Sequence, residues 1–292
     1  MLSFGSKKNF LRTNLFASDE KLPTSPQEIL NMDFSLKGKN ALVCGSSKGI
    51  GKAIAIALAE LGTTVTLVAR NEDKLIATKK ELNTDASQEH NILLCDFSKP
   101  AELKEIIQYH LKNYSYQILI NNTGGPPAGN ISDAKEEQFI SAFQNHLLCN
   151  HILAMALIPG MKQSGYGRIV NVISTSVKIP IKGLGVSNTI RAAVANWSKT
   201  LSGELAPFGI TVNNILPGAT KTERLEEIIR NRANNLKVNA EIIEEEMLAE
   251  IPMARFAVPA EVAAAAAFLA SPAASYITGI NIPVDGGRTG SL

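Results

Sequence analysis

Three glycines lie close together in the first part of the chain, in a pattern that fits the binding of a dinucleotide. The stretch from Cys44 to Gly51 reads CGSSKGIG, which gives the glycines a G-x-x-x-G-x-G spacing. The apolar run before it predicts a strand, and the apolar spacing after it predicts a helix. Glycine permits positive φ and close approach of backbone to a phosphate, and a helix N-terminus attracts negative charge. The glycines could simply form a tight turn, but in this context we expect a pyrophosphate site, with contacts from Gly45, Ser47, Lys48, Gly49, Ile50 and Gly51.

The residues after the second predicted strand indicate which nucleotide is bound. An acid at this place would bind the ribose 2′-hydroxyl of NAD, but residues 68–71 read VARN. Arg70, together with Lys48 inside the glycine-rich turn, is suited to pair with a 2′-phosphate. Both could be solvated surface charges, but their positions favour NADP(H) as the cofactor. Asp96, after the third predicted strand, is expected to accept a hydrogen bond from the adenine amino group.

Short apolar runs alternate with longer helical patterns from residue 40 onward. This order predicts an α/β fold, a doubly wound parallel sheet (Rossmann fold) in a single domain. The predicted strands are Ala41–Val43, Val65–Ala69, Ile92–Cys95, Gln117–Asn121, Arg168–Ile173, Ile210–Leu216 and Asn281–Val284. Residues 1–33 are expected to form an N-terminal arm and linker, and residues 34–292 the NADP(H)-binding domain. A charged segment at about 220–252 is expected to form a helical lid.

The composition argues against several classes of protein. Of the 292 residues, 45% are hydrophobic and 19% charged, with a formal net charge of +2, which is typical of a globular protein. This charge and the 5% of aromatic residues predict neither a nucleic acid nor a membrane as partner. The three cysteines are far apart in the sequence and predict reduced core thiols in a cytoplasmic protein. A basic N-terminal arm leaves organellar targeting open.

Further motifs accompany the glycine-rich turn in the order of a known family. They are NNTG at 121–124, RIVNVIS at 168–174, NNILPG at 213–218 and VDGG at 284–287. Over residues 34–288 the chain resembles the short-chain dehydrogenase/reductase family, most of all the branch that includes 3-oxoacyl-acyl-carrier-protein reductases. The resemblance implies an oxidoreductase that acts on a small-molecule carbonyl or alcohol and forms a homodimer or homotetramer. It also implies cofactor contacts from Asn122, Gly124, Pro217, Gly218 and Thr220.

The catalytic positions are where the sequence departs from this family. The family uses a Ser, a Tyr thirteen residues later, a Lys four residues after that, and an upstream Asn. Here Ser174 matches the Ser, but Ser187 replaces the Tyr, Arg191 replaces the Lys, and His146 falls at the place of the Asn. A Ser hydroxyl is shorter and far less acidic than a Tyr, and an Arg keeps its charge but does not release its proton.

Three accounts of the activity follow from these replacements, in order of preference. In the first, the protein is an NADPH-dependent reductase in which Ser174 orients the carbonyl and His146 or a water supplies the proton. In the second, it binds NADP(H) without redox chemistry, as a sensor or a subunit partner. In the third, it is a non-redox enzyme on the same fold, in which Arg191 holds an anionic substrate. A purely hydrogen-bonded role for His146 is compatible with each account.

Overall fold

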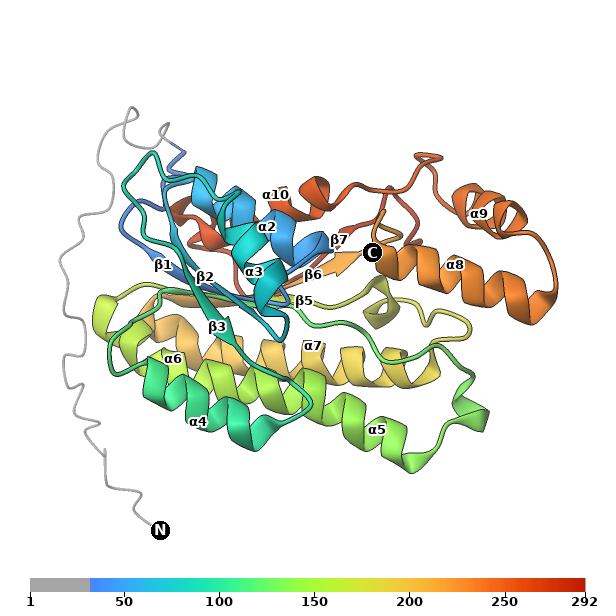
Figure 1. Ribbon diagram of the computed structural model, residues 1–292, viewed down its shortest axis with the longest axis horizontal. Coiled ribbons are helices and arrows are strands. Elements are labelled where there is room, and N and C mark those ends of the chain that lie inside the picture. Colours follow the sequence, from blue (N-terminus) through green and yellow to red (C-terminus); the bar gives the residue numbers. More distant parts are fainter. Residues whose placement is uncertain (1–31, 292) are drawn as a thin grey trace, which may run out of the picture. The chain divides into compact units, whose positions relative to one another are not determined.

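The computed structural model describes residues 32–291 of the chain (Figure 1). The predicted arm and linker at 1–33 therefore lies outside the described residues, apart from its last two positions. From Asp33 onward the chain forms one compact unit. In this described part, no helix is long and apolar enough to cross a membrane.

Seven strands of the described chain form one parallel sheet, in the order β3-β2-β1-β4-β5-β6-β7. Their bounds are β1 Asn40–Cys44, β2 Thr64–Ala69, β3 Asn91–Leu94, β4 Ile118–Asn121, β5 Gly167–Val172, β6 Ile210–Pro217 and β7 Asn281–Val284. The strand ends differ from the predicted ones by one residue at most, and the doubly wound parallel fold is confirmed. The five inner strands are buried and read as nearly continuous apolar runs, whereas the edge strands β3 and β7 are only half-buried.

Helices cover both faces of this sheet (Figure 1). One face carries α2 (Gly49–Glu60), α3 (Glu72–Lys79) and α10 (Pro259–Ala270), and the other carries α4 (Pro100–His110), α6 (Cys149–Ser164) and α7 (Gly185–Leu205). Successive side chains of a strand point to opposite faces of the sheet. Ala41 and Val43 therefore pack in the core under α2, α3 and α10, and Leu42 and Cys44 pack in the core under α4, α6 and α7. The short helix α5 (Glu136–Ala142) packs against α7.

The three cysteines lie in the core on the face covered by α4 and α6. Cys44, Cys95 and Cys149 come together there from distant parts of the sequence and form no disulfide. Burial raises the pKa of Cys95 and of Cys149 to about 12. Both thiols therefore stay protonated near neutral pH, which is the state of an inert core thiol.

The predicted lid segment consists of two helices with a break between them. The first, α8 (Glu223–Leu236), ends at Lys237, whose φ of 56° is left-handed, and α9 (Ala240–Ala249) begins after Asn239. An ion pair of 2.7 Å joins Arg232 to Glu246 across the two helices. The helices share a small core, apart from those of the sheet, formed by Leu225, Ile229, Ala233, Ile243, Ile251 and Phe256.

The order of the strands reverses between β1 and β4, which lie side by side at the middle of the sheet. Doubly wound sheets bind their ligands outside the carboxyl ends of the strands at such a reversal. The glycine-rich turn follows β1, and a loop at residues 122–127 follows β4. The fold therefore brings together two of the segments that the sequence associated with the cofactor.

Candidate active site

The glycine-rich turn is packed so closely against the loop after β4 that its first and last glycines admit no side chain. Gly45 has a φ of +60°, and a Cβ there would lie 2.3 Å from the carbonyl oxygen of Asn122. A Cβ on Gly51 would lie 2.2 Å from the carbonyl oxygen of Gly45. The Asn122 amide donates to the carbonyl oxygens of Cys44 and Gly45, at 3.3 Å in each case. The loop after β4 therefore holds the turn in its shape.

The N-terminus of α2 is open to an anion. Lys48 precedes this helix in an extended conformation, no side chain caps the first N–H groups, and no acid lies in the first turn. The first N–H groups of a helix lack intrahelical partners, and the helix dipole adds a partial positive charge there. Both features attract a phosphate, and the phosphate contacts expected of Gly49, Ile50 and Gly51 stay a prediction.

Three lysines line an open pocket of about 360 Å³ beside this turn. Lys48, Lys52 and Lys74 contribute to it together with Ser47 and Glu223. The carboxylate of Glu223, the first residue of α8, forms an ion pair with the Lys48 ammonium. This contact lowers the pKa of Glu223. The lysine predicted to bind a 2′-phosphate therefore already carries an acidic partner from the lid.

Arg70 and Asp96 lie close to each other, after β2 and β3. The Asp96 Oδ1 accepts hydrogen bonds from the N–H and the hydroxyl of Ser98, at 2.9 and 2.8 Å. These bonds, and more weakly the Arg70 charge, lower the pKa of Asp96. An ionised carboxylate only accepts hydrogen bonds, which is the property required to bind an adenine amino group. Arg70 itself is exposed at the surface.

A ladder of asparagine amides ties together the strands that carry the site loops. Asn121, Asn171, Asn214 and Asn281 lie in register on β4, β5, β6 and β7. Each amide N–H donates to the amide oxygen on the next strand, at 2.8, 2.9 and 2.8 Å. Five of the predicted site residues follow these strand ends within three positions: Asn122, Gly124, Ser174, Gly218 and Thr220. The ladder therefore sets the relative positions of the loops that carry them.

His146 lies in a π-helical segment, η2 (Phe143–Leu148), between α5 and α6. Such segments are rare and often occur at functional sites. The ring is 2% exposed, and its Nδ1 lies 2.6 Å from the Thr123 hydroxyl. Burial, and to a lesser extent the charge of Arg191, lowers the pKa of His146 to about 2. The imidazole is therefore neutral near neutral pH.

Arg191 is a buried cation that has no carboxylate partner in the described chain. It is 7% exposed on α7, and it donates to the carbonyl oxygens of Val172 and Thr123 at 3.4 and 3.3 Å. Burial, followed by repulsion from Arg224, lowers the pKa of Arg191 to about 10, so the side chain stays charged near neutral pH. Two long hydrogen bonds to neutral groups are the contacts that stabilise this charge.

The two serines of the predicted catalytic set have different surroundings. The Ser174 hydroxyl, after β5, accepts a hydrogen bond of 3.1 Å from the N–H of Ser176, which leaves its own proton for another acceptor. Ser187 is half-buried, and its hydroxyl makes no hydrogen bond within residues 32–291. It lies one helical turn before Arg191, on the same side of α7. The structure thus connects Arg191 to the loop after β4 but gives Ser187 no bonded partner.

The loop after β6 is held against the end of β7. Pro217 closes β6, and the N–H of Gly218 donates to the carbonyl oxygen of Val284 at 2.9 Å. Thr220 is 5% exposed, and its hydroxyl donates to the Gly218 carbonyl at 3.1 Å. Gly124, by contrast, is exposed, and a Cβ there would meet no atom within 4 Å. The backbone at Gly124 is therefore accessible to a ligand.

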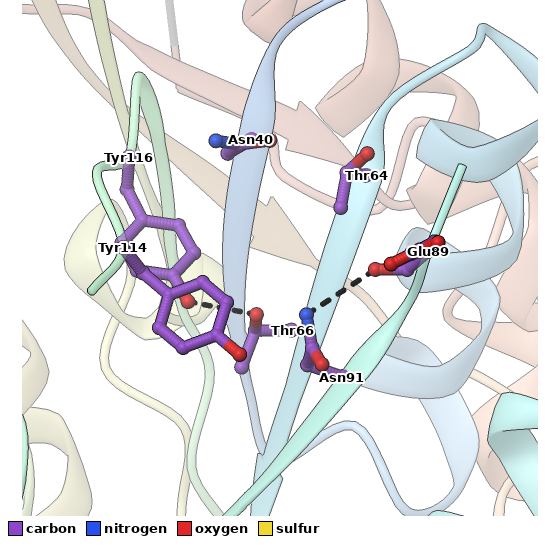
Figure 2. Close-up of a pocket in the computed structure, with 7 residues that line it drawn as sticks. All are labelled: Asn40, Thr64, Thr66, Glu89, Asn91, Tyr114 and Tyr116. Atoms are coloured by element: carbon purple, nitrogen blue, oxygen red, sulfur yellow. Dashed lines mark hydrogen bonds between the residues drawn. The ribbon is translucent and has the colours of Figure 1, made fainter. Parts of the chain in front are cut away.

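A further pocket, of about 240 Å³, lies at the opposite end of the strands (Figure 2). Asn40 and Thr64, which begin β1 and β2, contribute to it, and the Tyr116 hydroxyl lies 2.8 Å from that of Thr66. It is therefore separate from the glycine-rich turn, which follows the end of β1. Within residues 32–291, no group of His, Cys, Asp or Glu side chains is arranged to hold a metal ion.

Three residues at the site were not singled out from the sequence. Thr123 contacts both His146 and Arg191, while Glu223 and Arg224 reach from α8 to the glycine-rich turn and to the loop after β4. Thr123 stands inside the NNTG motif, but the motif itself indicates no role for its side chain. Glu223 and Arg224 are two charges among many in the lid segment, and the sequence contains no signal that distinguishes them.

Comparison with known proteins places the chain among reductases. Residues 45–289 match the protein family described as enoyl-(acyl carrier protein) reductase. The NADPH-dependent reductase BacG of Bacillus subtilis is 31% identical over 87% of this chain and 99% of its own length. The 3-oxoacyl-[acyl-carrier-protein] reductase FabG of Rickettsia felis is 35% identical, over 86% of this chain and 97% of its own.

A solved structure extends the likeness to three dimensions. The L-sorbose reductase of Gluconobacter frateurii, crystallised with NADPH and L-sorbose, has a TM-score of 0.83 and 30% identity to this chain. The match covers 89% of this chain and all of the reductase. The likeness therefore extends over most of the chain.

Proposed function

The chain belongs to the short-chain dehydrogenase/reductase family, and on this premise we propose that it is an NADP(H)-dependent oxidoreductase acting on a small-molecule carbonyl or alcohol. The observation that carries the proposal is the uncapped N-terminus of α2, which opens beside Lys48 at the carboxyl end of the sheet. The relatives support the direction of the reaction, because BacG and L-sorbose reductase are both named as reductases and both are described with NADPH.

The residues around the glycine-rich turn fit NADP(H). The N–H groups that begin α2 suit the pyrophosphate, and Lys48 and Arg70 suit the 2′-phosphate. Asp96 suits the adenine amino group, and the accessible backbone at Gly124 suits the nicotinamide side of the cofactor. When bound, NADPH supplies the hydride that reduces the carbonyl carbon.

In the proposed reaction, Ser174 and Arg191 act on the substrate oxygen. Ser174 donates its O–H to this oxygen and orients the carbonyl, since this hydroxyl donates no hydrogen bond within residues 32–291. Arg191 holds a permanent positive charge in buried surroundings, where it stabilises the negative charge that develops on the oxygen. Neither Ser187 nor Arg191 releases a proton near neutral pH. The proton that completes the alcohol therefore comes from a water, and solvent neutralises the hydroxide that remains.

The structure argues against His146 as the source of this proton. A histidine acts as a general acid near neutral pH only when its pKa lies near that range. The pKa of His146 is lowered to about 2, so its ring has no imidazolium proton to give. We propose instead that His146 positions the Thr123 hydroxyl, and through it the loop after β4.

The test has two stages. NADPH binding is first measured by the change in fluorescence of the cofactor, and carbonyl compounds are then screened for NADPH oxidation with the wild type and with Ser174→Ala and His146→Ala. We expect tight binding, turnover of at least one carbonyl, a loss of turnover in Ser174→Ala of at least about ten-fold and turnover retained in His146→Ala. Binding without oxidation of NADPH by any carbonyl would overturn the reductase proposal. A large loss of turnover in His146→Ala, in a folded variant, would return the histidine to the mechanism.

The absence of the family's Tyr and Lys favours a second candidate function, which the same screen separates from the first. Ser187 and Arg191 stand at the two positions where the family carries its acid and its cation. A protein that retains the NADP(H)-binding residues around the glycine-rich turn without these groups could serve as a sensor or a subunit partner. A non-redox enzyme that uses Arg191 for an anionic substrate is the third account. NADPH binding with no oxidation selects the second, and conversion of an anionic substrate with no change in NADPH selects the third.

We also propose that the protein works in the cytoplasm, which its free, buried cysteines support, and that it forms a homodimer or homotetramer, as the family resemblance implies. The near balance of charges, with a formal net charge of +2, supports neither a nucleic acid nor a membrane as partner. Light scattering of the purified full-length chain measures its mass in solution. A mass equal to that of one chain would contradict the oligomer.

A further inference from the structure

Arg191 is a buried cation with few groups around it to stabilise its charge. Moving a guanidinium out of water is costly unless the group is paired or fully hydrogen-bonded. Arg191 is 7% exposed, and within residues 32–291 it makes two hydrogen bonds, to carbonyl oxygens at 3.3 and 3.4 Å, which are longer than usual for N–H···O. It forms no ion pair within the described chain. The side chain therefore retains donor capacity for a charged acceptor.

A second guanidinium approaches the same loop from the lid. Arg224, the second residue of α8, donates to the carbonyl oxygen of Pro126 at 2.8 Å. In the described part of the chain its one carboxylate contact, with Glu227, is 3.5 Å long and exposed. Arg191 donates to Thr123, three residues earlier in this loop, and the two guanidinium groups lie close enough to repel each other. Two positive charges thus converge on residues 123–126, and Glu227 contacts Arg224 only weakly.

The negative charges of the cofactor have other partners. Its pyrophosphate is assigned to the start of α2, and its 2′-phosphate to Lys48 and Arg70, at the turn and at the end of β2. Arg191 and Arg224 instead contact the loop after β4, next to the accessible backbone of Gly124. These two cations therefore remain for the second ligand of the site, which is the substrate.

We propose that Arg191 and Arg224 together bind an oxyanion group of the substrate, so that the protein acts on carbonyl compounds that carry a carboxylate or a phosphate. A guanidinium presents paired N–H donors that match the oxygens of either group. This inference rests on the proposed function and names the substrate class for the same site. Since Arg224 belongs to α8, an anion bound between the two residues also draws the lid toward the loop after β4.

The experiment measures binding to the full-length chain saturated with NADP⁺, by isothermal titration calorimetry. Each anionic probe is compared with a neutral counterpart: pyruvate with methyl pyruvate, acetoacetate with methyl acetoacetate, and dihydroxyacetone phosphate with dihydroxyacetone. The first two pairs report on a carboxylate, and the third reports on a phosphate. The wild type is compared with Arg191→Met, Arg191→Lys and Arg224→Met. Arg230→Met is the matched control, because Arg230 is an exposed arginine of the same helix α8.

We expect at least one anion to bind about 10- to 100-fold more tightly than its neutral counterpart in the wild type and in Arg230→Met. This ratio should fall to about one in Arg191→Met and in Arg224→Met and recover in part in Arg191→Lys. If Arg191→Met does not fold, the half-exposed Arg224 decides the question through Arg224→Met. Equal affinity for charged and neutral probes, or a ratio that survives in both Met variants, would overturn the inference. So would a loss of NADP⁺ affinity in Arg191→Met with the ratio unchanged, because the guanidinium would then serve the cofactor.

The inference and the proposed function fail in different ways. If the protein turns over neutral carbonyl compounds and shows no preference for an anion, the proposal of a reductase is upheld and the proposal of an anionic substrate is overturned. Selective binding of an anion that depends on both arginines, with no oxidation of NADPH, upholds the anion site and overturns the reductase.

Discussion

The carboxylate of Glu223, the first residue of α8, binds the ammonium of Lys48 in the glycine-rich turn. The contact joins two segments that lie 175 residues apart in the sequence. It also places an acid on the lysine that is expected to hold the 2′-phosphate. Binding of NADP(H) must therefore displace Glu223 from Lys48 or bring two negative groups to one cation.

The first prediction concerns this competition. Glu223→Gln removes the negative charge and frees Lys48, so NADPH should bind about two- to five-fold more tightly while NADH binding stays the same. Fluorescence titration with each cofactor measures the two affinities. Glu226→Gln, on the same turn of α8, is the matched control, because Glu226 makes no ion pair in the described chain. An equal change for both cofactors would show that Glu223 does not compete with the 2′-phosphate.

The second prediction concerns the choice between NADPH and NADH. Arg70→Asp replaces the expected partner of the 2′-phosphate with an acid at the end of β2, the place where an acid would bind the ribose hydroxyls of NAD. NADPH affinity should fall about 10- to 100-fold, and NADH affinity should change much less. Lys79→Asp, at the far end of α3, makes the same change of charge away from the turn. Equal losses for both cofactors in Arg70→Asp would remove Arg70 from the 2′-phosphate site.

The third prediction concerns two glycines with opposite surroundings. Gly51→Ala forces a Cβ to within 2.2 Å of the Gly45 carbonyl oxygen, so it should abolish NADPH binding and lower the free energy of unfolding by at least about 2 kcal/mol. Gly203→Ala, at an exposed position of α7 with no atom within 4 Å, should raise it by about 0.5–1 kcal/mol. Urea unfolding of both variants measures these changes. Intact NADPH binding by Gly51→Ala would contradict the described turn.

The fourth prediction concerns the dependence of stability on pH. The pKa of His146 falls from 6.5 to about 2 on folding, so below about pH 6.5 the unfolded chain binds a proton that the native chain does not. Stability is therefore lost as the pH falls, by about 2 kcal/mol from this one group at about pH 5. Urea midpoints near neutral pH and near pH 5 should differ more for the wild type than for His146→Gln. The same pH dependence in both would mean that His146 titrates normally in the folded protein.

Local patterns explain why so much of the fold was predictable from the sequence. The stretch from β1 through the glycine-rich turn into α2 depends on near neighbours in the chain, and buried parallel strands leave continuous apolar runs. The break between α8 and α9 left only a weak sign, because Lys237 takes a left-handed conformation that a glycine more often adopts. The asparagine ladder has no local signal, because its hydrogen bonds join four different strands, although all four residues stand in or beside the apolar runs of β4, β5, β6 and β7.

The remaining features of the site depend on tertiary structure. The pKa of His146 is set by burial and by Arg191, which is 45 residues away, and no spacing in the sequence reports either of them. The contact of Arg224 with Pro126 joins residues 98 positions apart. Only the fold shows that the charge of Arg191 has no carboxylate partner within residues 32–291, since the sequence offers many acids that could have filled that role.

The most direct test of the central claim follows the hydride itself. NADPH that carries deuterium at the transferable position of the nicotinamide is incubated with the wild-type protein and a carbonyl compound, and the product alcohol is analysed by mass spectrometry. The proposed function predicts that deuterium appears on the carbon that was the carbonyl carbon, and that Ser174→Ala slows its appearance. Saturating binding of NADPH, with the label retained on the cofactor for every carbonyl compound, would contradict the claim that this protein is a reductase.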